Sequence, residues 1–348
     1  MIHAERECAK PAPEPWTARP CQPGDEGQIL DLFTRVFGAE RSLQHWYWKF
    51  RDNPVGEIHV YLAVTVSGQI VGQYAGLPVL FHWGGRTLQF VQILDVMVDP
   101  AFRSGLKKAG LFVKLAGRYI SDYAGAGGYG FPPLAPLRIG ERVGYKALHQ
   151  VQQLACSLQK PRAPAWSRSI ASWQWVVEEV QAFDARADRL WARCRSELPV
   201  AAIRDARYLN WRYAQHPEVR YRLLAIRRRG SDEWAGLAVL RLGGGQATAH
   251  LGQGEGAACL VDWLAPLGER WPAELLLTRI EAMGRENGMS DLYAWFRPGS
   301  AHWNLFLARG FQPEPTPMYF TALRCIDDIS LEWARDRWYY TMGDSDLY

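Results

Sequence analysis

The sequence predicts a protein of the α/β (α+β) class with two successive domains, each a mixed, mostly antiparallel sheet flanked by helices. Three observations predict this class. Residues 88–120 have the pattern of a strand, a tight basic turn and a helix. The strands predicted before them are joined by the short turns typical of an antiparallel meander. The second half of the chain then repeats landmarks of the first half in nearly the same register.

The elements of the first half follow from turn residues and hydrophobic periodicity. Asp25 is placed to cap a helix that runs to about Phe37, because apolar side chains recur on one face of that segment. Ser67-Gly68 and Gly84-Gly85 separate three strand-like segments, which predicts the meander. The predicted strands are 16–20, 58–64, 69–83, 88–98, 129–132 and 146–158, and the predicted helices are 25–37, 110–120 and 137–142.

Two motifs of the first half recur in the second half. The stretch Trp48-Lys-Phe-Arg-Asp-Asn-Pro54 is echoed by Trp211-Arg-Tyr-Ala-Gln-His-Pro217, and Gly144-Tyr145 is echoed by Gly310-Phe311. The separations from tryptophan to glycine are 96 and 99 residues, so the two halves keep nearly one register. The predicted strands are 221–226, 234–242, 257–264 and 292–296, with helices at 273–287 and after the N-cap Ser300. We predict domains at 1–160 and 206–325, a connecting strand and helix segment at 161–205, and an aromatic tail at 326–348.

Composition limits the classes of partner. A hydrophobic content of 48% and a charged content of 22% are ordinary for a globular protein of 348 residues, and a net charge of +4 does not indicate a nucleic-acid partner. No run of 18 apolar residues predicts a membrane span. The six cysteines and eight histidines lack metal-ligand spacing, so we expect reduced thiols, no metal and a cytoplasmic location.

The turn between the strand at 88–98 and the helix after it has the chemistry of an anion-binding site. It reads Arg103-Ser104-Gly105-Leu106-Lys107-Lys108-Ala109-Gly110, with three cations, two glycines and no acid. Backbone N–H groups and the positive end of the helix attract a phosphate, and glycine lets the backbone approach it closely. The alternative is a solvated basic turn.

The strand and turn resemble the coenzyme A motif of the GNAT superfamily of N-acyltransferases. The match runs Val96-Met97-Val98-Asp-Pro-Ala-Phe-Arg103-Ser104-Gly105. The glycine positions of the family motif are occupied here by Leu106 and Lys108, while the glycines lie at 105 and 110. The resemblance implies that acyl-CoA lies between the splayed fourth and fifth strands, held by Val96, Met97, Val98 and residues 103–110. It also implies acetyl-CoA or another acyl-CoA as co-substrate.

The second half has the GNAT order of elements without the basic turn. After Val261-Asp-Trp-Leu264 the chain continues Ala-Pro-Leu-Gly-Glu-Arg-Trp-Pro272, with a glutamate, two prolines and one arginine. Such a turn is poorly suited to a pyrophosphate. We therefore read a tandem GNAT protein whose second copy is degenerate and binds no CoA.

Asp95 and Tyr145 are the candidate catalytic residues. Acyl transfer to an amine needs a base for the ammonium proton and an acid for the leaving thiolate. Asp95 shares a strand face with apolar residues, where a carboxylate is costly unless it has a partner or a catalytic role. The alternative is a structural carboxylate. The tyrosine that serves as acid in many GNAT members is replaced by Gly140 and by Phe306 in the two copies, which leaves Tyr145 or water.

These observations predict an acyl-CoA-dependent N-acyltransferase. The resemblance implies direct attack in a ternary complex, with acetyl transfer to a primary amine of a small molecule, a sugar or a peptide, in a cleft between the domains. Two alternatives stay open: a donor carried by acyl-carrier protein, which the basic turn would suit, and a non-catalytic module that binds CoA or a partner. The aromatic tail is expected to dock on the domains, either as plain packing or with Asp344 and Asp346 contacting the acceptor.

Overall fold

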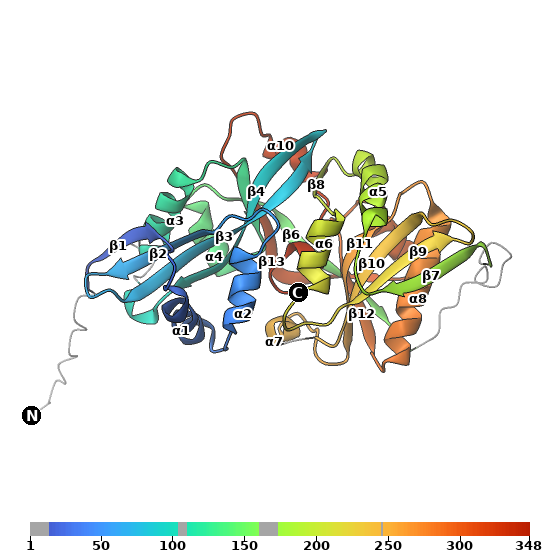
Figure 1. Ribbon diagram of the computed structural model, residues 1–348, viewed down its shortest axis with the longest axis horizontal. Helices are drawn as coiled ribbons and strands as arrows, with labels where there is room; N and C mark the ends of the chain where they lie inside the picture. Colours follow the sequence, from blue (N-terminus) through green and yellow to red (C-terminus); the bar gives the residue numbers. More distant parts are fainter. Residues whose placement is uncertain (1–13, 104–109, 160–172, 245) are drawn as a thin grey trace, which may run out of the picture.

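Thirteen strands form one sheet that runs through both halves of the chain (Figure 1). The computed structural model describes residues 14–103, 110–159, 173–244 and 246–348. The strands are β1 (Trp16–Pro20), β2 (His59–Thr65), β3 (Ile70–Trp83), β4 (Arg86–Val98), β5 (Gly127–Gly130), β6 (Lys146–Ser157), β7 (Trp175–Val180), β8 (Val200–Ala202), β9 (Arg222–Arg228), β10 (Trp234–Leu242), β11 (Ala257–Leu264), β12 (Asp291–Trp295) and β13 (Gln312–Arg324). Their order is β1-β2-β3-β4-β5-β13-β6-β12-β11-β10-β9-β7, and β8 pairs with β3.

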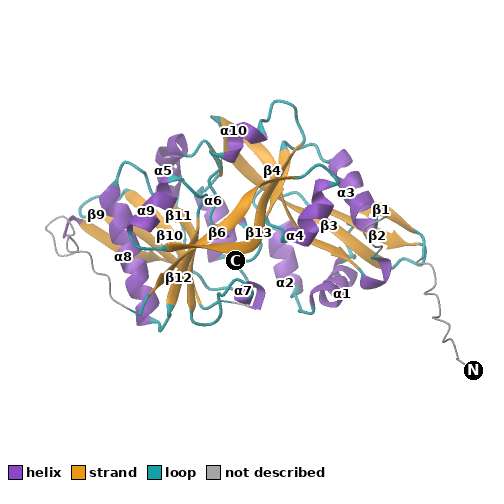
Figure 2. Ribbon diagram, turned by 180° about the vertical axis from the view of Figure 1, so that it is seen from behind, coloured by secondary structure: helices purple, strands orange, loops and turns teal. Residues whose placement is uncertain are grey.

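Helices cover both faces of this sheet (Figures 1 and 2). They are α1 (Glu26–Phe37), α2 (Leu43–Trp46), α3 (Leu111–Asp122), α4 (Leu134–Glu141), α5 (Ala185–Cys194), α6 (Ala206–Leu209), α7 (Gln246–Ala249), α8 (Arg270–Glu286), α9 (Ala301–Ala308) and α10 (Leu331–Arg335). On β2, Leu62 packs with α1 in the main core, while its neighbour Ala63 packs with α3 in a smaller one. Because strand side chains alternate between faces, α1 and α3 lie on opposite sides of the first half.

The two halves exchange their last strands. β13, from the second half, pairs with β5 and with β6 of the first half. β6 in turn pairs with β12 of the second half, with Cys156 opposite Leu292. The main hydrophobic core is therefore continuous across both halves. The predicted domains 1–160 and 206–325 each receive a strand from the other.

The repeated tryptophans meet where the halves join. Trp48 and Trp211 stack with their ring centroids 5.1 Å apart. The Nε1–H of Trp48 donates to the carbonyl of Trp211 at 2.7 Å, and the Nε1–H of Trp211 donates to the carbonyl of Trp48 at 2.8 Å. Both lie on π-helical turns, Tyr47–Arg51 and Asn210–Ala214. The sequence echo thus marks a local two-fold relation.

Most predicted elements lie within a few residues of the observed ones, and two of the differences have a clear physical reason. Asp25 precedes α1, but its carboxylate does not cap the helix. It pairs with Arg19 and accepts from the backbone N–H of Gln22, so the capping interpretation was wrong. The long strand β13 was not predicted, because three prolines between residues 312 and 317 interrupt its apolar pattern.

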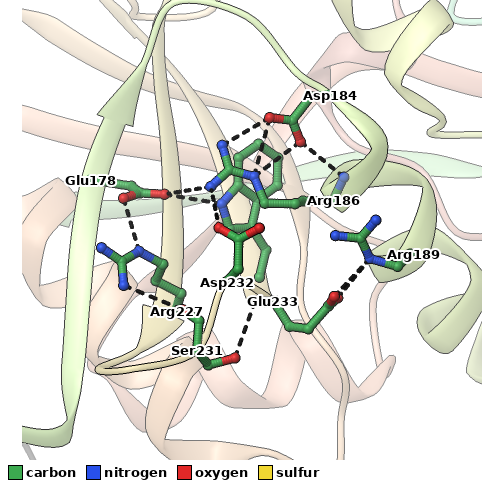
Figure 3. Close-up of polar contacts among 9 residues, drawn as sticks. Glu178, Asp184, Arg186, Arg189, Arg227, Ser231, Asp232 and Glu233 are labelled. Carbon is green, nitrogen blue, oxygen red and sulfur yellow. Dashed lines mark hydrogen bonds and ion pairs between the residues drawn. The ribbon is translucent and has the colours of Figure 1, made fainter.

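Polar contacts secure β7 at the outer edge of the second half (Figure 3). Glu178 accepts from the Nε of Arg227 at 3.0 Å and from the indole of Trp234 at 3.1 Å. Arg186, at the start of α5, lies over the same indole, 4.5 Å from its ring centroid, and pairs with Asp184. These side chains remain partly in solvent, so each pair contributes at most about 1 kcal/mol. We assign them to stability of the edge strand.

Candidate active site

The fourth and fifth strands separate at the point where the sequence placed a donor site. β4 and β5 pair in parallel only from Phe90 to Gln92, opposite residues 127–129. Beyond this point the register between β3 and β4 shifts, so that Asp95 and Val96 face the single residue Tyr74. Asp95 has a φ of +48°, the one positive φ among the described non-glycine residues. This β-bulge turns the backbone of β4 away from its neighbour.

A cavity of about 620 Å³ opens where the two strands separate. Its walls are residues 92–96 of β4, residues 130–133 after β5, and side chains of α1, α3, α4 and the C-terminal tail. Most of the lining is apolar, including Phe33, Phe112, Phe131, Leu137 and Met318. The first turn of α3 borders it through Phe112, which brings the positive end of that helix to the cavity. The cavity suits a largely apolar ligand with an anionic end.

Asp95 lies in this wall, already paired with two cations. Arg41 donates to both of its carboxylate oxygens, and the Nζ of Lys49 lies 3.5 Å from Oδ2. Burial alone would raise the pKa of Asp95, but Arg41 and Lys49 outweigh it and hold that pKa well below its ordinary value. Only 4% of the side chain is exposed. An ionised carboxylate held this firmly is a weak proton acceptor, so the geometry supports the structural alternative.

Tyr145 lines the same cavity, immediately before β6. Its hydroxyl lies 3.5 Å from that of Tyr74. Burial raises the pKa of Tyr145 well above its ordinary value. The phenol therefore keeps its proton at neutral pH, which an acid requires.

The residues predicted to bind CoA divide into two groups. Ser104, Gly105, Leu106, Lys107, Lys108 and Ala109 lie outside the described residues. Of the others, Val96 lines the cavity, and Gly110 is the N-cap of α3. The Nε of Arg103 donates to the carbonyl of Val98 at 3.0 Å. Met97 is buried in the main core, so its side chain is not available to a ligand.

The C-terminal tail brings a second carboxylate to the cavity. Asp346 accepts from Lys49, with 29% of its side chain exposed, and it lines the cavity with Ser345 and Leu347. Asp344 is instead fully buried against Arg204 at 2.6 Å. The predicted docking of the tail therefore serves packing at one aspartate and the cavity at the other.

Sequence reasoning missed Arg41 and Lys49, although a signal was present. Lys49 follows Trp48 as Arg212 follows Trp211, and Arg41 precedes Trp48 by seven residues as Arg204 precedes Trp211. Extending the repeat to these positions would have identified Arg41 and Arg204 as counterparts. They pair with Asp95 of β4 and with Asp262 of β11.

Residues 17–147 match the family model of the acetyltransferase (GNAT) domain. The chain thus contains a GNAT domain at these residues. No curated protein matches the sequence.

Solved structures with the same fold extend over nearly the whole chain. A probable N-acyltransferase from Enterococcus faecalis V583 shares 13% identity, with a TM-score of 0.66 over 88% of this chain and 72% of that one. A GCN5-related N-acetyltransferase from Anabaena variabilis shares 13% identity, with a TM-score of 0.65 over 90% and 73%. N-myristoyltransferase of Saccharomyces cerevisiae, solved with myristoyl-CoA, shares 11%, with a TM-score of 0.56 over 91% and 81%. At these identities the likeness concerns the fold.

Two strands of the second half also separate, and the space between them is filled by the chain itself. β11 and β12 pair in parallel from Ala257 to Leu260 and then separate. The tail enters this opening: Tyr339 donates to the carbonyl of Trp263, and Thr341 donates to Asp262 at 3.2 Å. At the following turn, the N–H of Leu267 donates to Glu197 at 2.7 Å. A carboxylate of the chain itself thus binds the turn that would meet a phosphate.

No helix in residues 14–103, 110–159, 173–244 and 246–348 is both long and apolar enough to cross a bilayer. No group of three histidine, cysteine, aspartate or glutamate side chains in the same part of the chain is arranged to hold a metal ion.

Proposed function

We propose that the chain is an N-acyltransferase that uses one acyl-CoA, bound in the GNAT domain, to acylate a primary amine. The observation that carries the proposal is the apolar cavity between the diverging β4 and β5, with the first turn of α3 beside it. The pantetheine arm and acyl group would fill the cavity, and the phosphates would lie at the basic turn before α3. Acetyl is the acyl group we favour.

The bulge at Asp95 and Val96 would orient the thioester. These two residues stand opposite one residue of β3, so the β4 peptide groups no longer follow the regular ladder. We place the thioester carbonyl against this backbone, where N–H groups would stabilise the developing oxyanion.

Asp346 is the base that the geometry favours over Asp95. Burial is the largest influence on Asp346 and raises its pKa. Lys49 and Arg41 act against this rise, and the charge of Asp95 adds to it. Unlike that of Asp95, the side chain of Asp346 remains partly accessible from the cavity. Asp346 takes a proton from the ammonium of the acceptor. The free amine attacks the thioester carbonyl, and the C–S bond of the tetrahedral intermediate breaks as Tyr145 gives its proton to the leaving sulfur. The second proton on the nitrogen passes through solvent to restore the tyrosine, which leaves a neutral amide and a free thiol.

Calorimetry with acetyl-CoA and release of free thiol with a panel of amines test this proposal together. Asp346→Asn should keep acetyl-CoA affinity and lower kcat by ~10²–10⁴, the range for a lost acid–base group. Asp327→Asn, in the exposed turn after β13, is the matched control and should keep full turnover. Unchanged kcat in Asp346→Asn would remove that residue from proton transfer.

The same measurements separate the alternatives. Turnover with acyl-carrier protein, and none with CoA thioesters, would show that the acyl donor is carried by acyl-carrier protein instead of CoA. Binding of acetyl-CoA without turnover of any amine would indicate a binding module. A chain that binds no CoA thioester would overturn the proposal.

A further inference from the structure

A second, smaller cavity is lined by residues of both halves and by residues 345–348 of the C-terminal tail. The end of this tail lies near the centre of the molecule (Figure 1). The cavity has a volume of about 190 Å³. It shares five lining residues with the larger cavity: Arg41, Gln92, Ser345, Asp346 and Leu347. Its remaining lining comes from both halves, including Trp48 and Trp211. A molecule placed here would therefore border Asp346, as would a ligand of the larger cavity.

Four cations line this cavity, and three of them are engaged by the protein. Arg41 pairs with Asp95, and Lys49 pairs with Asp346. Arg212 donates to backbone oxygens of the tail, those of Gly343, Ser345 and Tyr348. The fourth is Arg241, at the end of β10.

Arg241 is half-buried in the wall of this cavity and has no carboxylate partner. No hydrogen bond or ion pair joins it to any other residue within 14–103, 110–159, 173–244 and 246–348. Its positive charge acts on groups in the cavity: it contributes to the lowered pKa of His216 and opposes the increase in the pKa of Tyr348. A partly desolvated guanidinium without an anion is costly, and cavities that contain one commonly bind an anion.

His216 supplies a hydrogen-bond donor of fixed orientation beside Arg241. Its Nδ1 accepts from the backbone N–H groups of Glu218 at 3.2 Å and Val219 at 3.0 Å. The proton of the neutral ring is therefore on Nε2. Burial and the charge of Arg212 lower the pKa of His216 to about 2, so the ring stays neutral at physiological pH. The ring packs against Trp48, with centroids 4.3 Å apart, which fixes its plane.

We propose that Arg241 and the Nε2–H of His216 bind an anionic group of the acceptor, a carboxylate or a phosphate. This inference rests on the acyltransferase function proposed above and assigns its acceptor class: a small amine that also carries a negative charge. Asp346 borders both cavities, so the amine of such an acceptor lies between the anion subsite and the thioester. The anionic group would also offset the repulsion between the acceptor's ammonium and the cations of the cavity.

Matched pairs of acceptors test the inference. With acetyl-CoA as donor, thiol release is measured for amino acids against their amides, and for O-phosphoethanolamine against ethanolamine. The anionic member of one pair should have at least ~10-fold higher kcat/KM, the value of a charged hydrogen bond. Whichever pair responds identifies carboxylate or phosphate as the group. Arg241→Gln should abolish that preference by raising KM for the anionic member, and Arg241→Lys should restore part of it.

Controls keep folding and function apart from this inference. Arg220→Gln removes an exposed arginine of the same half and should keep the preference. Calorimetry with N-acetylglycine and with inorganic phosphate gives a second reading that needs no turnover. Binding that is lost in Arg241→Gln would support the anion site even if no amine were acylated, and the transferase proposal alone would then fail. Equal use of charged and neutral amines, or equal binding by both proteins, would overturn the anion site while leaving the transferase intact.

Discussion

The same strand separation occurs twice in this molecule, with opposite outcomes. In the GNAT domain, β4 and β5 diverge around a cavity of about 620 Å³. In the second half, β11 and β12 diverge around the chain's own tail, with Tyr339 and Thr341 bonded to the wall. The same strand separation is thus open in one half of the molecule and filled in the other. The difference indicates that ligand capacity depends on what fills the space between the strands.

The two openings share one arrangement of charged side chains. Each central strand carries an aspartate, Asp95 or Asp262, paired with an arginine seven residues before the shared tryptophan. The exposure of the arginines is 9% for Arg41 and 1% for Arg204. The tail closes the second pair completely through Asp344 and leaves the first at the edge of a cavity. The corresponding ion pair is therefore fully buried in the second half, whereas in the first half it lines the candidate site.

The largest effect is expected on removing Arg204 from its buried ion pairs. Arg204→Gln leaves Asp262 and Asp344 buried without their cation, so the free energy of unfolding should fall by ~3–5 kcal/mol. Urea denaturation measures this. Arg86→Gln, which removes a half-exposed pair with Asp328, should change stability by no more than ~1 kcal/mol. Equal losses of unfolding free energy in the two variants would show that the buried pair stabilises the protein no more than the exposed one.

Asp95→Asn distinguishes a structural role of this carboxylate from a role as the catalytic base. We expect a loss of stability of ~3 kcal/mol with turnover per folded molecule nearly intact, because the carboxylate is held by two cations. A fall in kcat of ~10²–10⁴ at unchanged melting temperature would instead restore Asp95 as the base.

The acidic limb of the stability curve tests the same residue. The folded pKa of Asp95 is lowered, so its contribution to stability is present above the unfolded pKa of about 4 and lost as the pH falls below it. Asp95→Asn should flatten this part of the curve, and a curve identical to that of the unaltered protein would contradict the buried pair.

Coenzyme binding tests whether the second opening is closed. Calorimetry should give one acetyl-CoA per chain, because Glu197 occupies the second turn and the tail fills the second opening. Arg103→Ala should weaken that binding by ~1–3 kcal/mol, the range for a lost charged hydrogen bond. A stoichiometry of two would end the comparison between an open and a filled copy, and unchanged affinity in the variant would remove Arg103 from the site.

A further test concerns His302, which packs on Tyr339 of the tail in the second half. Burial lowers its pKa to about 4, so the folded state holds it neutral while the unfolded state protonates it below about pH 6.5. Between these values stability should therefore fall with acidification, by up to about 1.4 kcal/mol per pH unit from this residue. His302→Gln should reduce that slope in urea denaturation at pH 5 and 7. The same slope in both proteins would show that His302 does not contribute.

The sequence predicted most elements because they depend on local signals, and the expected donor site also rests on a local signal. The basic turn and the strand before it are adjacent in the chain, and their chemistry is legible without a fold. The ion pair of Asp95 required Arg41 and Lys49, which lie 54 and 46 residues earlier and meet it only through the fold. The direction of the pKa shift at Asp95 therefore could not be decided from the strand alone.

The anion subsite shows the same limit. Arg241 and His216 stand on separate elements that no motif connects, and only the approach of the two halves brings them to one cavity. The tail was expected to dock, yet its two aspartates differ in role because one reaches Arg204 and the other Lys49. Long-range pairing of this kind leaves no periodic trace in the sequence.

The exchanged strands set the order in which the protein can be completed during synthesis. Ala147 pairs with Thr321, so the sheet of the GNAT domain stays unfinished until the ribosome has added 174 further residues. Until then the edges of β5 and β6 that β13 will cover stand open, and open edges invite pairing with other chains. Such non-local closure also slows folding. A chain released early, even one that contains the whole family match at 17–147, would depend on chaperones rather than on its own core.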